Sequence, residues 1–225
     1  MRLSQILHTP LAIAITLGAI ALLLCGCSLN RPYQEKERFG LNLGDVQRAS
    51  TTHAGALAVE RVRIAAPFSG HQFVYRTGDE RYRVDYFNEF VTPPEALLSG
   101  ALERALADAR IHETIVGPGS RVEQIRRLET SVTYLAGDVS VQGEPRAVVR
   151  ARFLLIDESG AAPAVVGDWV FQASEPMPSA TPEELAAAFG RAFTDIANRL
   201  IRAMDRGYAE SYSSISAIPE RTAHE

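Results

Sequence analysis

Cysteine is the residue type in this chain whose position most clearly predicts a chemical reaction. The sequence holds two cysteines, and Leu24-Cys25-Gly26-Cys27 places an aliphatic residue three positions and a small residue one position before Cys27. This spacing is a lipobox, because the thiol of the last cysteine takes a diacylglyceryl group and the small residues let a peptidase reach the backbone. We expect cleavage after Gly26, covalent diacylglyceryl and N-acyl lipid on Cys27, and no other cofactor.

The segment that must deliver Cys27 to a membrane is a short apolar run. Arg2 gives a positive start, and residues 11–24 are almost all apolar. At 1.5 Å per residue, a helix of this length spans about 21 Å, less than the roughly 30 Å of a bilayer core. The run therefore fits a removable signal peptide, residues 1–26, better than a membrane span. An ordinary signal peptide with a chance cysteine, or an uncleaved anchor, is the alternative.

The residues after the lipobox predict where the protein is held. Two or three acyl chains give stable anchoring, where a single chain would be marginal. Ser28 follows the modified cysteine, and it is not the aspartate that commonly retains lipoproteins in the inner membrane of enteric bacteria. Residues 27–37 are polar and contain Pro32, as expected of a tether. We expect a protein anchored by lipid to the periplasmic face of the outer membrane.

Composition excludes several functional classes. Of the 225 residues, 199 remain after removal of the first 26, which suits one domain. Arg2 is the one charged residue removed, so basic residues fall from 23 to 22 against 27 acidic ones. This acidic balance argues against a nucleic-acid partner. With both cysteines near the N-terminus, the body of the chain has no disulfide, no thiol chemistry and no cysteine-based metal site.

The histidines are the next candidates for chemistry, and they do not form a motif. His53, His71, His112 and His224 are scattered over predicted loops and the C-terminal tail. None stands three or four residues from another metal-ligand type on a predicted helix, so we interpret them as solvated and expect no metal site. We expect no enzyme activity. A periplasmic hydrolase assembled from residues distant in sequence is the alternative.

One α+β domain, residues 38–206, must position these residues. Two amphipathic helices are predicted, from Thr92 to about Arg110 and from Thr181 to near Gly207, each opening on a Thr-Pro capping pattern. Residues 207–225 are predicted to be disordered. Alternating patterns predict strands over residues 38–43, 57–65, 73–76, 81–86, 114–116, 124–135, 146–157 and 164–173. The resulting fold class is a mixed, largely antiparallel sheet with both helices packed on it.

An aromatic hairpin is the candidate binding feature. Six aromatic residues occur between Phe73 and Phe90, on two strands joined by a turn at residues 77–80. Core packing against a helix is one interpretation, and a surface facing lipid or a protein partner is the other. The candidate partner-binding residues are Phe73, Tyr75, Arg76, Tyr82 and Tyr86.

The order of these features resembles the family of ABC-type transport auxiliary lipoproteins. The resembling features are the lipobox at Cys27, the segment Phe39-Gly40-Leu41-Asn42-Leu43 and an apolar strand that ends at Pro67. Phe73-Val74-Tyr75-Arg76 then stands where family members read close to (I/V)-V-Y-R, and Tyr82 and an aromatic stretch follow before a leucine-rich helix. The resemblance covers roughly residues 38–206.

The resemblance implies a non-catalytic accessory subunit of an intermembrane lipid transport system. ATP use would belong to an ABC transporter complex, and lipid passage to an MCE-domain protein. The lipoprotein would dock the far end of that conduit at the outer membrane, with a homo-oligomeric ring of copies as one arrangement. A structural or assembly lipoprotein of the cell envelope, unlinked to transport, is the alternative.

Overall fold

The computed structural model describes residues 35–216, with side chains as far as Tyr208. The expected signal peptide, Cys27 and most of the expected tether lie outside the described residues, as do residues 217–225. No helix within the described part of the chain is long and apolar enough to cross a membrane.

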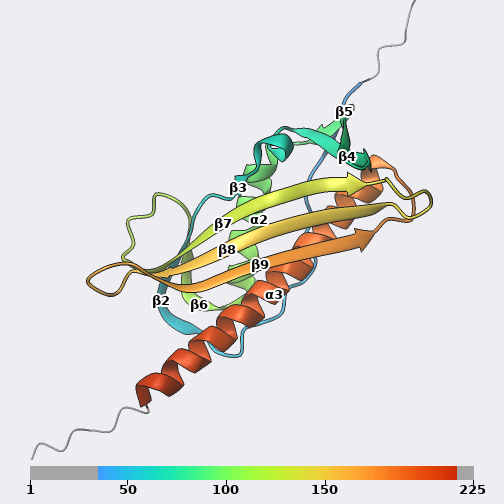
Figure 1. The fold of residues 1–225 in the computed structure, drawn as a ribbon. Helices are drawn as coiled ribbons and strands as arrows, with labels where there is room; N and C mark the ends of the chain where they lie inside the picture. The colour runs from blue at the N-terminus through green and yellow to red at the C-terminus, as the bar shows by residue number, and fades with distance from the viewer. Residues whose placement is uncertain (1–34, 217–225) are drawn as a thin grey trace, which may run out of the picture. The chain divides into compact units, whose positions relative to one another are not determined.

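The described residues form nine strands, one short 3-10 helix and two α-helices (Figure 1). The strands are β1 (Glu37–Phe39), β2 (His53–Val59), β3 (Arg63–Ile64), β4 (Gln72–Gly78), β5 (Arg81–Phe90), β6 (His112–Val116), β7 (Gln124–Asp138), β8 (Arg146–Asp157) and β9 (Ala164–Pro176). The helices are η1 (Ala66–Phe68), α2 (Pro94–Ala109) and α3 (Pro182–Ser216).

The long strand β7 organises the sheet. One edge of β7 pairs antiparallel with β8 along nearly its whole length, and β8 pairs in the same way with β9. The other edge pairs in parallel with three strands in turn, β2, β3 and β4. The hairpin partner β5 then extends the sheet beyond β4, and the short strand β1 pairs with the end of β5. The fold class is therefore α+β with a mixed sheet whose longest ladders are antiparallel, as predicted.

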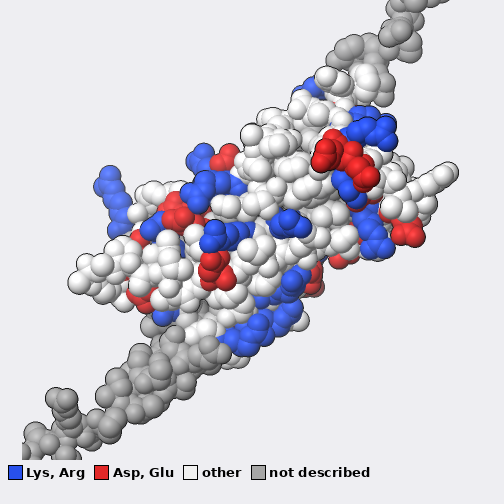
Figure 2. Space-filling model, in the orientation of Figure 1, with Lys and Arg blue, Asp and Glu red and all other residues white. Residues whose placement is uncertain are grey.

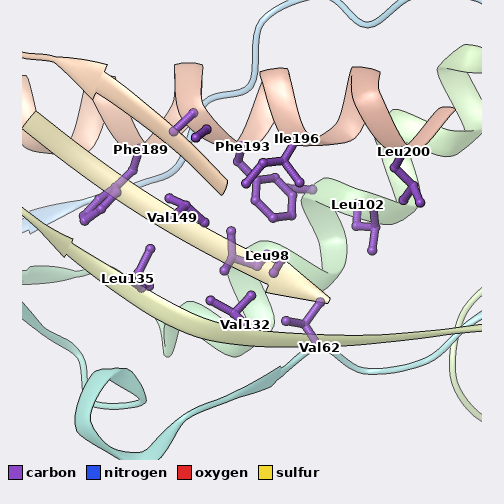
Figure 3. Packing of buried hydrophobic residues seen from close by; sticks show 14 of the residues in the cluster. Val62, Leu98, Leu102, Val132, Leu135, Val149, Phe189, Phe193, Ile196 and Leu200 are labelled. Atoms are coloured by element: carbon purple, nitrogen blue, oxygen red, sulfur yellow. The ribbon is translucent and has the colours of Figure 1, made fainter. Parts of the chain in front are cut away.

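Both helices cover one face of this sheet. The apolar face of the predicted amphipathic C-terminal helix is a stripe of fully buried residues, since Leu185, Phe189, Phe193, Ile196 and Leu200 are each at most 2% exposed. Figure 3 shows side chains of this stripe packed between the helices and the inward side chains of the strands. Burying large apolar side chains of this kind stabilises the fold by roughly 1.5–3 kcal/mol each. The opposite face of β7, β8 and β9 carries neither α2 nor α3 (Figure 1), and Phe68 of the short helix η1 packs at its edge against Tyr134 of β7.

The ends of both helices differ from the prediction. Helix α2 has Pro93 at its N-cap and no side-chain capping bond, so Thr92 does not cap it. At the start of α3, the predicted cap is present, because the N–H of Glu184 donates to Oγ1 of Thr181 at 3.4 Å. Helix α3 does not end near Gly207 but continues to Ser216. Tyr208 is only 3% exposed, and burial of this ring explains why the helix continues past Gly207.

The segment between β1 and β2 is held against α3 rather than left as a loose loop. Strand β1 ends at Phe39, short of the predicted residue 43, and residues 41–50, here called the strap, follow α3. Gly190 of α3 permits this approach, because a Cβ atom there would lie 2.1 Å from the carbonyl oxygen of Asn42. Three backbone N–H groups of the strap donate to α3 side chains: Gly44 to Thr194 Oγ1 (3.0 Å), Gln47 to Asn198 Oδ1 (2.7 Å) and Ser50 to Asp205 Oδ2 (2.7 Å).

Candidate functional site

A polar groove crosses the uncovered face of the sheet. It encloses about 410 Å³ and lies over β4, β5, β7, β8 and β9. Figure 2 shows this face, on which basic and acidic side chains are interspersed over the sheet, while basic side chains gather along the edge formed by α3. We call it the outer groove, and its lining includes Arg76, Tyr82, Tyr134, Asp138, Arg150 and Gln172.

Strand register brings the first charged pair of the outer groove together. Arg76 on β4 is the parallel partner of Asp138 at the end of β7. The Nη2 and Nε atoms of Arg76 lie 2.6 and 3.1 Å from Oδ2 of Asp138, and Nη2 also donates to Oγ of Ser140 at 3.1 Å. Burial alone would raise the pKa of Asp138, but hydrogen bonds from Arg76 and Ser140 hold that pKa below its usual value. The pair therefore stays ionised and fixed in position.

An aromatic wall borders this pair. The ring centroid of Tyr134 lies 4.9 Å from that of Phe68 and 6.4 Å from that of Tyr82. Burial raises the pKa of Tyr134 well above its ordinary value, and a hydrogen bond with Tyr82 raises it further. The Tyr134 hydroxyl therefore remains a neutral donor and acceptor at physiological pH. Because Tyr82 is also 48% exposed, it offers an apolar ring and a polar tip to solvent.

Arg150 supplies a second cation on the far side of the outer groove. Its Nε and Nη2 atoms donate to Oε1 of Gln172, at 2.8 and 2.5 Å. Gln172 is uncharged, so it orients the guanidinium without neutralising it. The neighbouring Arg152 instead forms two bonds with the carboxylate of Asp168. The outer groove thus presents Arg150 as a held cation beside an aromatic wall, an arrangement suited to binding a polar or acidic side chain.

The five predicted partner-binding residues do not lie on one surface of the structure. Phe73 is fully buried and Tyr75 is 2% exposed, so neither can offer its side chain to a partner, and these two predictions are corrected. Strand β4 lies between β5 and β7, and its inward side chains pack into the core; burial raises the pKa of Tyr75 to about 12. Arg76 and Tyr82 line the outer groove. Tyr86 is 74% exposed on β5 and lies outside that lining.

Two of the histidines are not solvated, which corrects the sequence interpretation. His53 begins β2 and His112 begins β6, and parallel pairing of these strands sets the two residues opposite each other. Both are less than 9% exposed, with ring centroids 5.7 Å apart. Within the described residues, no three histidine, cysteine, aspartate or glutamate side chains are grouped as a metal site. His71 is half-buried near the carbonyl oxygen of Phe90, and His224 lies outside the described residues.

Tyr134, Asp138, Arg150 and Gln172 are outer-groove residues that the sequence did not single out. The alternation of Arg150 and Arg152 with apolar residues along β8 does signal an outward-facing row. It does not say which strands lie on either side of that row. The pairing of Tyr134 with Arg150 and of Arg150 with Gln172 across three strands depends on the tertiary register.

Comparison with known proteins gives one family match and several similar folds. The family model described as ABC-type transport auxiliary lipoprotein component matches residues 41–200. The crystal structure of protein XCC0632 from Xanthomonas campestris has a TM-score of 0.70 at 17% identity, covering 79% of this chain and 99% of that one. An uncharacterised protein has a TM-score of 0.56 at 16% identity, covering 74% and 98%. At these identities the two structures show a shared fold. No protein in the curated comparison set matches the chain.

Proposed function

The chain belongs to the family of ABC-type transport auxiliary lipoprotein components, and on that premise we propose that it is the non-catalytic, lipid-anchored subunit of an MCE/ABC-type intermembrane lipid transport system. Its role is to bind the conduit and hold it at the membrane, while ATP hydrolysis and lipid passage belong to the other subunits. The family description, an auxiliary component of transport, supports a binding role rather than a catalytic one.

The outer groove is the observation that carries this proposal. The family match includes every strand that builds it, from β4 to β9. The side chains that line it are positioned by one another before any partner arrives, which lowers the entropic cost of binding. An open groove on the uncovered face of a sheet suits contact with a protein surface. We assign this contact to the MCE-domain protein.

The side chains of the outer groove indicate which chemical groups a partner segment must present. Arg150 is available to a carboxylate or a backbone carbonyl, because its own partner Gln172 is neutral. Tyr82 and Tyr134 offer apolar ring faces next to it. A partner segment with an acidic side chain beside an apolar one would satisfy both. Tyrosine and arginine are also the residue types that most often dominate the energetics of protein interfaces.

Lipid on Cys27 is the proposed anchor. The lipobox at residues 24–27 and Ser28 support attachment to the periplasmic face of the outer membrane. We also propose that several copies form a ring around the end of the conduit. Native mass spectrometry of the lipidated protein in detergent would give the copy number, and a monomer at all concentrations would reject the ring.

Purification of the intact assembly tests the proposed function. The full chain with a C-terminal affinity tag is expressed from its own locus and purified after mild detergent extraction. We expect the MCE-domain protein and the ABC transporter subunits to co-purify with it. The Cys27→Ala variant should lose metabolic labelling with palmitate and leave the membrane fraction. Recovery of envelope proteins without any transporter subunit would favour the structural or assembly role instead.

A further inference from the structure

Strand β5 contains an irregularity near its C-terminal end. Gln72 of β4 pairs with Glu89, whereas Val74 pairs with Val84. Two residues of advance along β4 therefore correspond to five along β5. The extra residues of β5 have no hydrogen-bonded partner on β4. We call residues 85–88 the bulge. Bulges at the edge of a sheet redirect side chains and are treated as built features rather than defects.

The carboxylate of Asp85 fixes the bulge from within. Its Oδ1 atom accepts hydrogen bonds from the backbone N–H groups of Phe87 and Asn88, at 3.0 and 3.2 Å. Its Oδ2 atom accepts a third bond from the side-chain amide of Asn88, at 3.0 Å. One side chain thus satisfies two of the backbone N–H groups that do not pair with β4. The bulge therefore has a defined conformation that can present its side chains in a fixed direction.

The side chains presented by this region are large and apolar. Tyr86 is 74% exposed, Phe87 42% and Val91 50%. These three lie within six residues of one another, on either side of the segment of β5 that pairs with β1. Single exposed apolar residues are ordinary, but three large ones so close together in the sequence of one structured segment indicate a candidate contact surface.

The chain enters the domain beside the bulge. Strand β1 pairs in parallel with residues 88–90 of β5, and the N–H of Val91 donates to the carbonyl oxygen of Phe39 at 2.9 Å. Lys36 and Arg38 both contact the carboxylate of Glu89, at 2.9 and 3.1 Å. The first residues of the domain are therefore fastened to the last residue of the bulge and to the strand segment that follows it.

The chain outside the domain is short. Eight residues lie between Cys27 and Lys36, and the nine steps from one to the other, at 3.3–3.6 Å each, reach at most about 32 Å when fully extended. A lipid on Cys27 would hold the β1 end of the domain within this distance of the bilayer. The tether would then keep the bulge close to the bilayer, at a high effective concentration for contact with its surface.

We propose that the bulge and the nearby Val91 form a membrane-contact surface, with Tyr86, Phe87 and Val91 seated in the headgroup region of the bilayer that carries the lipid anchor. This inference rests on the lipidation of Cys27 in the proposed function and adds the orientation of the domain. Aromatic rings of this kind favour the membrane–water interface, since a Tyr ring has an apolar body and a polar tip.

The charges around the bulge are compatible with this contact. The Asp85 carboxylate is turned inward onto the backbone of the bulge. Glu89 is 7% exposed, and hydrogen bonds from Lys36 and Arg38 lower its pKa. Both acidic groups close to the apolar side chains are thus already satisfied within the protein. Seating the bulge in the interface does not require an unpaired carboxylate to lose its water.

Site-specific labelling of the lipidated full chain tests the proposal. Single cysteines are introduced as Tyr86→Cys, Val91→Cys and, as a matched exposed control, Val141→Cys, which is 56% exposed in the native chain. Each variant carries a nitroxide label and is reconstituted in vesicles of phosphatidylethanolamine and phosphatidylglycerol. We expect labels at positions 86 and 91 to lose collisions with a water-soluble nickel complex, relative to position 141. Two labelled positions keep the test valid if one substitution disturbs the fold.

A second pair of variants asks whether the apolar side chains cause the contact. Tyr86→Ser with Phe87→Ser should restore access of the nickel complex to a label at position 91. Val165→Ser with Val170→Ser changes similarly exposed residues on β9 and should leave that access unchanged. Equal access at positions 86, 91 and 141 would overturn the proposal. If the labels became accessible to the nickel complex when the protein was diluted in excess lipid, their protection would come from contact between copies. That result would also overturn the proposal.

Mass spectrometry of the reconstituted protein distinguishes failure of the lipid anchor from failure of the membrane contact. A chain without lipid on Cys27 would overturn the anchor and this inference with it. A lipidated chain whose labels at positions 86 and 91 remain open to water would overturn the inference and leave the proposed function standing.

Discussion

The Nε2 atom of His112 lies 2.9 Å from the hydroxyl oxygen of Tyr208, and this contact joins β6 to the part of α3 beyond Gly207. The ring of His53 lies 3.9 Å from that of Tyr208, centroid to centroid. The guanidinium of Arg126 lies 4.1 Å from the centre of the Tyr208 ring, and Asp157 contacts Arg126 at 3.6 Å. Residues of β2, β6, β7 and β8 thus fasten the helix beyond Gly207.

This cluster predicts that acid destabilises the protein. Burial lowers the pKa of His112 to about 4, and the nearby His53 and Arg126 contribute to the lowering. The unfolded chain has a histidine pKa near 6.5, so between pH 6.5 and pH 4 the unfolded state binds a proton that the folded state does not. Stability conferred by the neutral ring is therefore complete above pH 6.5 and is lost as the pH falls toward 4. We expect a loss of about 3 kcal/mol from this residue.

Urea unfolding at pH 7 and pH 4.5 measures this effect. The matched variant is His112→Gln, which keeps a polar side chain near Tyr208 and removes the titrating ring. The variant should be less stable than the native chain at pH 7 but less sensitive to acid. An identical pH dependence in both proteins would assign acid sensitivity to other groups.

Tyr208 should contribute to stability mainly through its ring. Tyr208→Phe removes one hydrogen bond to His112 and should cost about 1 kcal/mol. Tyr208→Ala also removes a ring that is 3% exposed and should cost about 3–5 kcal/mol. Denaturant titration gives both values. If Tyr208→Ala were as stable as the native chain, the part of α3 beyond Gly207 would not be docked in solution.

Because the strap packs against α3 at one glycine but not at the other, Gly→Ala substitutions at two positions of this helix should change stability in opposite directions. Gly190→Ala would place a Cβ atom against the carbonyl oxygen of Asn42, and forcing the strap away should cost about 1–3 kcal/mol. Gly207→Ala has open space around the added atom and should be neutral or stabilise the helix by up to about 1 kcal/mol. Thermal unfolding of the two variants compares them directly. Equal stabilities would show that the strap does not pack against α3.

The sequence predicted where the helices and strands lie better than it predicted which strands pair with one another. Alternation and helical spacing located the hairpin, the three long strands and both helices, because those patterns are local. They could not show that β2 pairs with β6, which brings His53 to His112, or that β4 pairs with β7, which brings Arg76 to Asp138. Tyr75 and Tyr82 also look alike in sequence, yet one is buried and the other is exposed. Register pairs Tyr82 with Arg76 and Tyr75 with Arg83, so the two rings lie on opposite faces of the hairpin, and only the fold decides which face is covered.

The outer groove makes a prediction about binding that is separate from stability. Tyr82→Ser with Arg150→Gln changes two exposed side chains of the groove and should leave the unfolding midpoint nearly unchanged. The same variant should recover at least about tenfold less MCE-domain protein in affinity purification, as expected for the loss of interface anchors. Val165→Ser with Val170→Ser is the control, because both residues are exposed on β9 and neither lines the groove.

Photo-crosslinking from the outer groove in cells tests the central claim most directly. A photoreactive amino acid replaces Tyr82, and a control chain carries it at Val122, which is 52% exposed on another part of the domain. The account predicts a crosslink from position 82 to the MCE-domain protein of the transport system, and none from position 122. Crosslinks from position 82 only to envelope proteins unrelated to transport, or none at all in a membrane-anchored, folded chain, would contradict it.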